Sequence, residues 1–228
     1  MTMWLVTAVA ILGAAFSMTS GGQTPQGVPS SQLHEVISAE YALVLNEARL
    51  SGPLTARPSK FMADEQPVDV DWERRPADEH LKKGVCLADA VVVARPKTVQ
   101  SFTDREDVFV FTEYLLTVEE GLRHATNGAQ LRYVRPGGRV KRSRSLTVGA
   151  TSGLYPEIRE GERYLFFLHR AAGDVFVVAL PFDAFALSDG VARVIGPGVF
   201  RASFRKGLSP EQLKEWVKAA SCGNGELE

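Results

Sequence analysis

The chain carries almost no net charge, and this absence argues against one large class of partners. Its 26 Lys and Arg residues are balanced by 27 Asp and Glu residues, which leaves a formal net charge of −1. Proteins that bind nucleic acids attract phosphates through an excess of positive charge. We therefore expect no nucleic-acid partner, and any electrostatic recognition has to depend on a local group of charges.

Recognisable motifs for catalysis and metal binding are missing as well. Ser152 stands in the stretch 149–153, which lacks the pattern of a nucleophile elbow. Asp69 and Asp71 alternate with valines, but a calcium loop needs more oxygen ligands at fixed spacing. We therefore expect no cofactor and favour a non-catalytic protein. The four histidines are far apart and have no metal-binding spacing: His34, His80, His124 and His169.

Two possibilities for chemistry stay open. The acidic residues Asp104, Glu106 and Asp107 form either an ordinary solvated loop or a turn that binds a cation. The chain could also be a hydrolase whose groups meet only in three dimensions, and Glu113, Glu162 and His169 are the candidates for such a site. A pocket with at least two converging titratable groups would favour this alternative.

Cysteine is scarce: Cys86 and Cys222 are the only two, too few for a zinc site of their own. In an oxidising compartment they predict one disulfide, and two unpaired buried thiols are the alternative. A bond between them would disfavour the unfolded chain by roughly 5 kcal/mol in the chain-entropy model. It would also attach the C-terminal helix to the entry of the first strand.

The chain has one long apolar run, over residues 3–16, which small and polar residues follow. At about 1.5 Å per residue it reaches roughly 21 Å as a helix, short of the ~30 Å hydrocarbon core of a bilayer. This length favours a signal peptide, with Ala15 and Ser17 as the small residues before a cleavage at Met18. No Lys or Arg precedes Arg49, so a membrane anchor at residues 3–16 and a buried segment of a cytosolic protein remain alternatives. We expect an exported protein, periplasmic or extracellular.

Four segments follow from these patterns. They are a signal peptide or short anchor at 1–20, a tether, amphipathic helix and Pro/charge-rich linker at 21–84, a β-domain with a C-terminal helix at 85–222, and a tail at 223–228. A short helix at 77–83 is expected to stop at Gly84. The amphipathic helix begins near Ser31 and ends at Gly52, and its single apolar stripe favours packing on the β-domain over packing on a partner. That stripe consists of Leu33, Val36, Ile37, Tyr41, Val44 and Ala48.

Short apolar stretches between turn residues predict five to seven strands. They cover 88–94, bounded by Pro96, then 108–118, 131–135, 164–168, 175–180 and a hairpin at 185–195 that turns at Asp189-Gly190. The strand 108–118 alternates at period two and is long for a flat sheet, so we expect it to bend and to end at Gly121. This pattern predicts a mainly β fold, a small antiparallel barrel or sandwich.

A helix closes the β-domain at its C-terminal end. Ser209 is the expected N-cap, Pro210 takes the first helical position, and Gln212 completes a capping box. Gly223 provides the stop. The predicted apolar stripe of this helix consists of Leu213, Trp216, Val217 and Ala220.

The strongest local charge is a basic run of Arg139, Lys141, Arg142 and Arg144, predicted to lie in a loop after Gly137-Gly138. Four cations of this kind form either a solvated loop or an anionic-ligand patch. The ligand would be an anionic glycan or an envelope protein. Single-stranded nucleic acid is disfavoured because export and the neutral overall charge argue against it.

The stretch Cys86–Val93, with Asp89 ahead of a run of valines, resembles the opening of netrin-like domains, the OB-fold modules of tissue inhibitors of metalloproteases. The Glu119–Gly121, Arg135–Gly138 and Gly161–Leu168 stretches fit that layout, so the resemblance covers roughly Cys86 to Leu180. Small exported bacterial proteins show a similar string of features. The resemblance implies an OB-like barrel. The inhibitors chelate a protease zinc through a free N-terminal Cys, and Cys86 is internal, so that activity is not implied.

The sequence thus predicts a non-catalytic exported binding or interaction module, an OB-like barrel between an N-terminal amphipathic helix and a C-terminal helix. Its partner would be an envelope protein or an anionic glycan. It would touch a membrane only through an uncleaved N-terminal segment. The alternatives are the hydrolase described above and a membrane-tethered structural protein.

Overall fold

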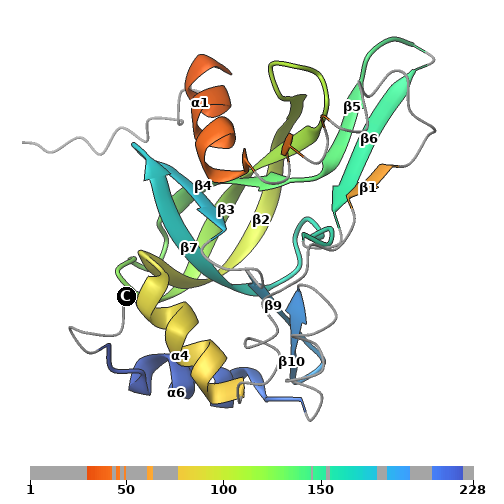
Figure 1. The fold of residues 1–228 in the computed structure, drawn as a ribbon. Coiled ribbons are helices and arrows are strands. Elements are labelled where there is room, and N and C mark those ends of the chain that lie inside the picture. Colours follow the sequence, from red (N-terminus) through yellow and green to blue (C-terminus); the bar gives the residue numbers. More distant parts are fainter. Residues whose placement is uncertain are drawn as a thin grey trace, which may run out of the picture.

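A computed structural model describes residues 30–42, 45–46, 49, 61–63, 77–144, 146–152, 155–178, 184–195 and 207–222. The predicted signal or anchor segment at 1–20, Val44 and Ala48 of the helix stripe, most of the linker, and the tail at 223–228 with Gly223 lie outside these residues. The described part holds a β-barrel with helices packed at its two ends (Figure 1).

Five strands form the barrel and confirm the mainly β prediction. They are β2 (Ala90–Thr103), β3 (Val110–Arg123), β4 (Gln130–Pro136), β7 (Tyr164–Ala172) and β8 (Val175–Val178). They pair in the order β7-β2-β3-β4-β8, and β8 pairs with β7 again, which closes the ring. All these pairs are antiparallel except β4 with β8, which is parallel. Outside the ring, β9 (Ala184–Ser188) and β10 (Val191–Ile195) extend the sheet from β7.

Strands β2 and β3 are both longer than predicted. Pro96 does not end β2. Proline has no backbone N–H to donate, but β2 pairs with β7 only as far as Ala94, so no hydrogen bond to β7 is lost at Pro96. Gly121 does not end β3 either, which continues to Arg123. Register shifts interrupt the β2–β3 ladder at three places, and bulges of this kind bend a strand and increase its local twist.

The barrel interior is filled by side chains. Tyr133 and Phe166 are completely buried, with ring centroids 5.5 Å apart, and Tyr114 stacks beside Tyr133 at 6.2 Å. The predicted core role of the strand aromatics is confirmed, because six of them are buried: Phe109, Phe111, Tyr114, Phe166, Phe167 and Phe176.

Helix α1 (Ser30–Glu40) covers one outer face of the barrel, as its stripe predicts (Figure 1). Leu33, Val36 and Ile37 are buried in one cluster with Phe109 and Phe111 of the sheet. Just beyond the helix, the Tyr41 hydroxyl donates to the Val134 carbonyl oxygen at 2.7 Å. The helix therefore packs on the β-domain, as its single apolar stripe predicts.

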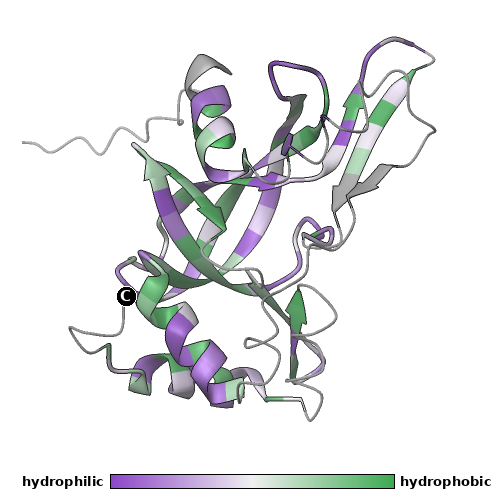
Figure 2. Ribbon diagram, in the orientation of Figure 1, coloured by the Kyte–Doolittle hydropathy of each residue, from purple (hydrophilic) through white to green (hydrophobic). Residues whose placement is uncertain are grey.

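At the opposite end, α4 (Ala77–Leu87) and α6 (Pro210–Ala219) pack together against the sheet (Figure 1). Both helices carry hydrophilic as well as hydrophobic residues (Figure 2), as amphipathic helices do. The predicted stop at Gly84 is wrong: α4 runs through the buried Gly84 to Leu87, because Leu81 and Val85 beside it pack into the same core. The first barrel strand, β2, therefore begins at Ala90, and Cys86 lies on α4.

Helix α6 follows its predicted caps closely. Ser209 accepts a hydrogen bond from the backbone of Gln212, whose side chain accepts one in return, so the capping box is confirmed. Leu213 and Val217 are buried, but Trp216 is 40% exposed and does not belong to the buried stripe. Its ring lies at the outer side of the α4–α6 layer, in a shallow groove with Leu81 and Ala220.

The predicted disulfide is present. Cys86 and Cys222 are bonded, with Cα atoms 5.5 Å apart and a sequence separation of 136 positions. The bond joins the end of α4 to the segment after α6. Arg123 at the end of β3 lies beside it, with a guanidinium nitrogen 3.1 Å from Cys222 Sγ.

A second, three-stranded sheet was not predicted. It consists of β1 (Phe61–Ala63), β6 (Thr147–Ser152) and β5 (Gly138–Lys141), in that order. Strands β5 and β6 form a hairpin that projects away from the barrel (Figure 1). The β9–β10 hairpin, in contrast, turns at Asp189-Gly190 as predicted, with positive φ values of 53° and 72°.

Candidate functional site

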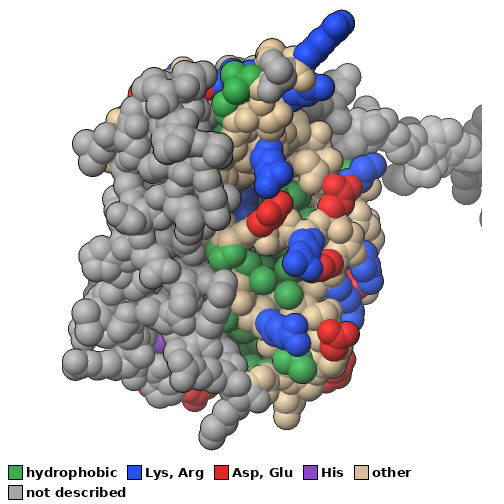
Figure 3. Space-filling model, turned by 90° about the vertical axis from the view of Figure 1, so that its right-hand side faces the viewer, with side chains coloured by type: hydrophobic (Ala, Val, Ile, Leu, Met, Phe, Trp, Pro, Cys, Tyr) green, Lys and Arg blue, Asp and Glu red, His purple; other side chains and the backbone are tan. Residues whose placement is uncertain are grey.

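The four predicted cations lie on the projecting hairpin of β5, β6 and the turn between them, which we call the cationic hairpin. They were expected in a loop, but Arg139 and Lys141 belong to β5. Their side chains are exposed on one face of the strand, whereas Val140 between them packs against the core cluster under α1. A cationic side chain projects at the top of the described surface in Figure 3, at the height of this hairpin.

The structure does not unite all four cations in one patch. Arg142 forms an ion pair with Asp107 and donates to Thr103 Oγ1 at 3.1 Å, so it fastens the hairpin to the β2–β3 turn. Arg139, Lys141 and Arg144 are exposed, and none of these three forms an ion pair with a described residue. The predicted patch is therefore reduced to three cations that face solvent.

The acidic residues at 104–107 organise the β2–β3 turn. The buried carboxylate of Asp104 accepts hydrogen bonds from the backbone N–H groups of Glu106, Val108 and Phe109. Glu106 forms an ion pair with Arg49. The hydrogen bond from Arg49 and, to a smaller extent, its positive charge lower the pKa of Glu106. Each carboxylate has a partner inside the chain, and the described residues contain no cluster of metal-ligating side chains.

The hydrolase candidates Glu113, Glu162 and His169 engage three different partners. Glu113 is buried on β3 and pairs with Arg132 of β4 at 2.6 Å. Glu162 is exposed and accepts from the Tyr164 hydroxyl at 3.0 Å. His169 pairs with Asp89 at 2.7 Å on a half-exposed part of β7. The structure therefore does not bring these three groups together.

A cavity of about 440 Å³, which we call the barrel-mouth pocket, lies at one end of the barrel. Strand β7 pairs with β2 only as far as Tyr164, while β2 and β3 stay paired up to Thr103 and Val110. The coil at 155–163 takes the place of β7 there, and Gly161 N donates to the Pro96 carbonyl at 2.9 Å. The pocket lies between this coil and the inner faces of β2, β3 and β4.

A buried arginine lines this pocket. Arg135 of β4 faces the barrel interior together with Leu131 and Tyr133, because these residues alternate along the strand. Only 2% of its surface is exposed. Its guanidinium donates to the Pro156 carbonyl and lies 6.0 Å from the centroid of the Tyr155 ring. The coil thus fixes the position of a buried positive charge at the pocket wall.

Hydroxyl groups line the strand side of the pocket. Thr112 donates to the Gly137 carbonyl at 2.7 Å, so in its 3.0 Å contact with Ser101 the Ser101 hydroxyl is the donor. The acceptor lone pairs of Ser101 are left for other groups. Gly138 has a φ of +134°, and a Cβ there would lie 2.1 Å from Thr112 Oγ1, so only glycine fits this turn.

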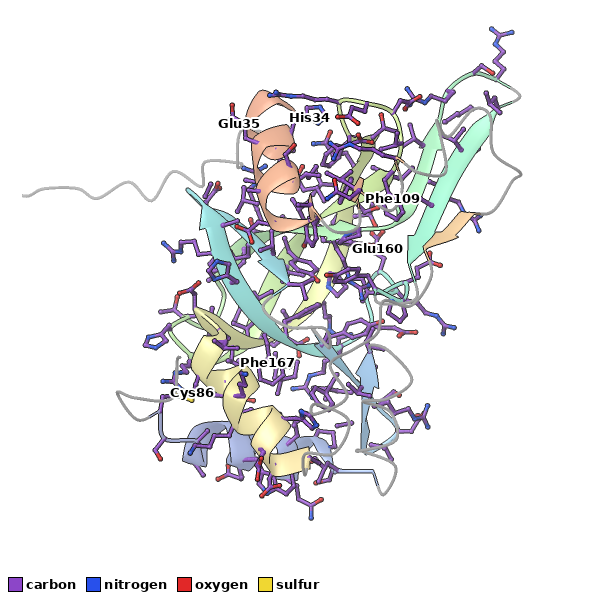
Figure 4. The ribbon with its side chains drawn as sticks, viewed as in Figure 1. His34, Glu35, Cys86, Phe109, Glu160 and Phe167 are labelled. Atoms are coloured by element: carbon purple, nitrogen blue, oxygen red, sulfur yellow. A yellow bond between two sulfur atoms is a disulfide. The ribbon has the colours of Figure 1, made fainter. Side chains whose placement is uncertain are left out.

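Charged groups of both signs stand at the rim of the pocket. Arg139 of the cationic hairpin lies on one side, and Glu157, Arg159 and Glu160 of the coil lie on the other. Figure 4 labels Glu160 on this coil, next to the barrel strands. Arg159 also reaches Glu162 at 3.3 Å.

A larger cavity of about 760 Å³ lies on the other side of the same coil, against β9 and β10, and shares Glu157 and Arg159 with the pocket. Tyr164 lines it, and burial, followed by its hydrogen bond to Glu162, raises the pKa of Tyr164 to about 12. All charged side chains described in its wall are exposed. The barrel-mouth pocket, in contrast, is lined by a buried charge, Arg135, and burying a charge costs desolvation energy that the rest of the fold has to offset. We therefore regard the barrel-mouth pocket as the stronger candidate site.

Sequence reasoning found Arg139 but missed Arg135, Arg159 and the two rim glutamates. A usable signal existed for Arg135, since it shares period-two spacing with Leu131 and Tyr133 and so belongs to the inner face of the strand. The coil residues gave none, because their placement beside β2 depends on a contact across more than sixty residues, from Pro96 to Gly161.

Comparison with family models, curated proteins and solved structures gives no match to this chain. The resemblance to netrin-like domains therefore stays a prediction, although the barrel itself is present. Among the described residues, no helix is long and apolar enough to cross a bilayer.

Proposed function

We propose that the chain is an exported, non-catalytic binding module that recognises an anionic glycan through its cationic hairpin. The observation that carries this proposal is the set of three exposed cations, Arg139, Lys141 and Arg144, which no described acidic residue neutralises. An otherwise neutral protein attracts a polyanion only where such charges are concentrated. The ion pair of Arg142 with Asp107 holds the hairpin at a fixed position on the barrel.

Export is part of this proposal. The disulfide between Cys86 and Cys222 is compatible with an oxidising compartment, and the apolar run at residues 3–16 has the length of a signal peptide. Acidic polysaccharides are polyanions that an exported protein meets outside the cytoplasm. An OB-like barrel with a projecting hairpin would present its cations to such a chain.

A non-catalytic role is supported by the interior of the barrel, which Tyr133, Phe166 and their neighbours fill. The three groups considered for hydrolysis each engage a separate partner. Glu157 and Glu160 do line one pocket, but both are exposed at its rim. Binding is therefore the activity that the arrangement of residues supports best.

The test uses polygalacturonate as the probe and a charge-matched pair of double variants. The hairpin variant Lys141→Glu/Arg144→Glu should bind the polymer at least about tenfold more weakly at low salt. The control variant Lys97→Glu/Arg193→Glu changes net charge by the same amount at exposed sites outside the hairpin, on β2 and β10, and should bind like the parent chain. Equal affinity of the two variants would reject the cationic hairpin as the binding surface.

A further inference from the structure

We propose that the barrel-mouth pocket binds a single uronic acid unit, the sugar carboxylate at the end of an acidic glycan chain. This inference rests on the proposed function for the identity of the polymer. It adds a second subsite with its own chemistry, and a free monosaccharide tests it separately. Four features of the pocket lead to this ligand class.

Positively charged side chains line the pocket and can attract the carboxylate of the sugar. Arg135 lines the wall as a buried guanidinium, and Arg139 and Arg159 stand at the rim from two different elements. A guanidinium binds a carboxylate through two parallel hydrogen bonds, which are stronger than neutral ones. Arg159 already reaches Glu162 and Arg135 already donates to the Pro156 carbonyl, whereas Arg139 forms no ion pair with a described residue. Arg139 is therefore the cation that the acidic group of a ligand would meet at this cavity.

Negative charge at the same rim excludes a simple polyanion. Glu157 and Glu160 line the pocket beside Arg159, and they would repel a multiply charged ligand such as phosphate. Carboxylates accept hydrogen bonds, and sugar hydroxyls can donate them. The Ser101 hydroxyl keeps acceptor capacity on the opposite wall. The ligand should therefore carry several hydroxyl groups together with one negative charge.

Apolar surface is available for the ring of the sugar. Tyr155 and Ile158 line the pocket on the coil, and Tyr114 lines it from β3. Ligand sites combine apolar and aromatic walls with a few placed polar groups, and aromatic rings offer flat apolar faces. A hydroxylated ring with one carboxylate can contact all three parts of the lining: the cations, the hydrogen-bond acceptors and the apolar side chains.

The depth of the pocket limits the ligand to one unit. The volume of about 440 Å³ falls within the range of small-molecule sites, roughly 300 to 1,000 Å³. Below it, the buried rings of Tyr133 and Phe166 fill the barrel, so no chain can pass through. The pocket is a closed end, which suits the terminus of a polymer better than an internal segment.

The first experiment is isothermal titration of the full chain with galacturonate, and with galactose, acetate and inorganic phosphate as separate probes. We expect saturable binding of one galacturonate with a Kd of about 1 mM or tighter, and at least about tenfold weaker binding of the other three probes. Absence of galacturonate binding would overturn the proposal. Equal or tighter binding of acetate or phosphate would also overturn it, since the pocket would then be a plain anion site.

The second experiment assigns the binding to the pocket. Glu160→Gln and Arg139→Gln replace exposed rim groups, so the fold should be unaffected, and each should weaken galacturonate binding by about threefold to tenfold. Arg144→Gln, outside the pocket, should leave galacturonate binding unchanged while it weakens polygalacturonate binding. Galacturonate binding that ignores both rim variants would place the sugar elsewhere and reject the pocket.

These variants also separate the two proposals. Binding of the polymer that depends on Lys141 and Arg144, without any binding of free galacturonate, would sustain the proposed function and reject the subsite. Binding of galacturonate that depends on Glu160, together with polymer binding that ignores the hairpin, would sustain the subsite and reject the hairpin.

Discussion

The disulfide between Cys86 and Cys222 encloses the entire barrel in one covalent loop, so replacing both residues with alanine should lower stability substantially. Both cysteines are only half-buried, and the substitution removes little packing from the core. The main effect should therefore fall on the unfolded chain, which gains freedom when the loop is opened.

The size of the effect follows from the length of the loop. With a sequence separation of 136 positions between the two cysteines, the chain-entropy relation gives a loss of about 17 cal/mol/K, or about 5 kcal/mol at 25 °C. This figure is an upper estimate, because residual structure in the unfolded chain already restricts it. A domain of this size typically unfolds with a stability of 5–15 kcal/mol, so the variant should be only marginally stable.

Urea denaturation followed by far-ultraviolet circular dichroism measures this loss. With a slope of about 2 kcal/mol per molar urea, the midpoint should fall by about 2 to 2.5 M. The parent chain under reducing conditions is the matched control and should unfold together with the variant. A loss below about 1 kcal/mol would refute the entropic reasoning. A reduced parent that stays clearly more stable than the variant would instead assign the effect to side-chain packing.

Three further predictions concern single residues. Glu113→Gln removes the buried one of the two carboxylates that pair with Arg132 and leaves only the exposed Asp174 at 3.2 Å, so it should destabilise the barrel by about 3 kcal/mol in urea denaturation. A loss under about 1 kcal/mol would contradict this reasoning. Gly138→Ala should lower the free energy of unfolding by about 2 kcal/mol or more, because its φ is +134° and a Cβ there would clash with Thr112. Gly128→Ala is the control: an added Cβ meets open space there, so the loss of stability in the same assay should be smaller. Burial raises the pKa of Glu120, but hydrogen bonds and charge attraction from two lysines of α6 outweigh burial and lower this pKa below 4.5. The stability that this carboxylate contributes is therefore fully present above pH 4.5, and it is lost as the pH falls through the lowered pKa of the folded state. Melting temperatures between pH 3 and 7 should therefore fall less steeply for Glu120→Gln than for the parent chain, and identical slopes would contradict this assignment.

Local patterns were sufficient to predict most strands and both terminal helices. Alternation around Tyr114, the stripe through Ile37, and the capping residues Ser209 and Gln212 each act within a few residues, and each prediction is confirmed. Such signals are reliable because the same side chains that set the local conformation also form the buried face.

The errors came from residues whose environment is set by distant parts of the chain. Local sequence predicts a strand end at Pro96, but this residue lies where β7 has already left β2. It also predicts a helix end at Gly84, but this glycine is buried within α4, and tertiary packing offsets its poor helix propensity. The β5–β6 hairpin is rich in Arg, Ser and Gly, and its strands lack the apolar alternation that a prediction needs.

The candidate site was predictable only in part for the same reason. Arg139 stood out by charge density, whereas Arg135 becomes notable only when the coil at 155–163 covers it. A pocket wall assembled from five strands and a coil leaves no contiguous motif in the sequence.

The bulge in β2 has a consequence for the chemistry of the barrel mouth. Thr98 pairs with Tyr114 and Gln100 pairs with Glu113, so the ladder skips Val99, which is 54% exposed. Without the bulge, strict alternation along the same residues would turn Ser101 outward and aim the amide of Gln100 at the barrel-mouth pocket. The way the ladder accommodates one residue therefore decides whether a hydroxyl or an amide meets whatever enters there.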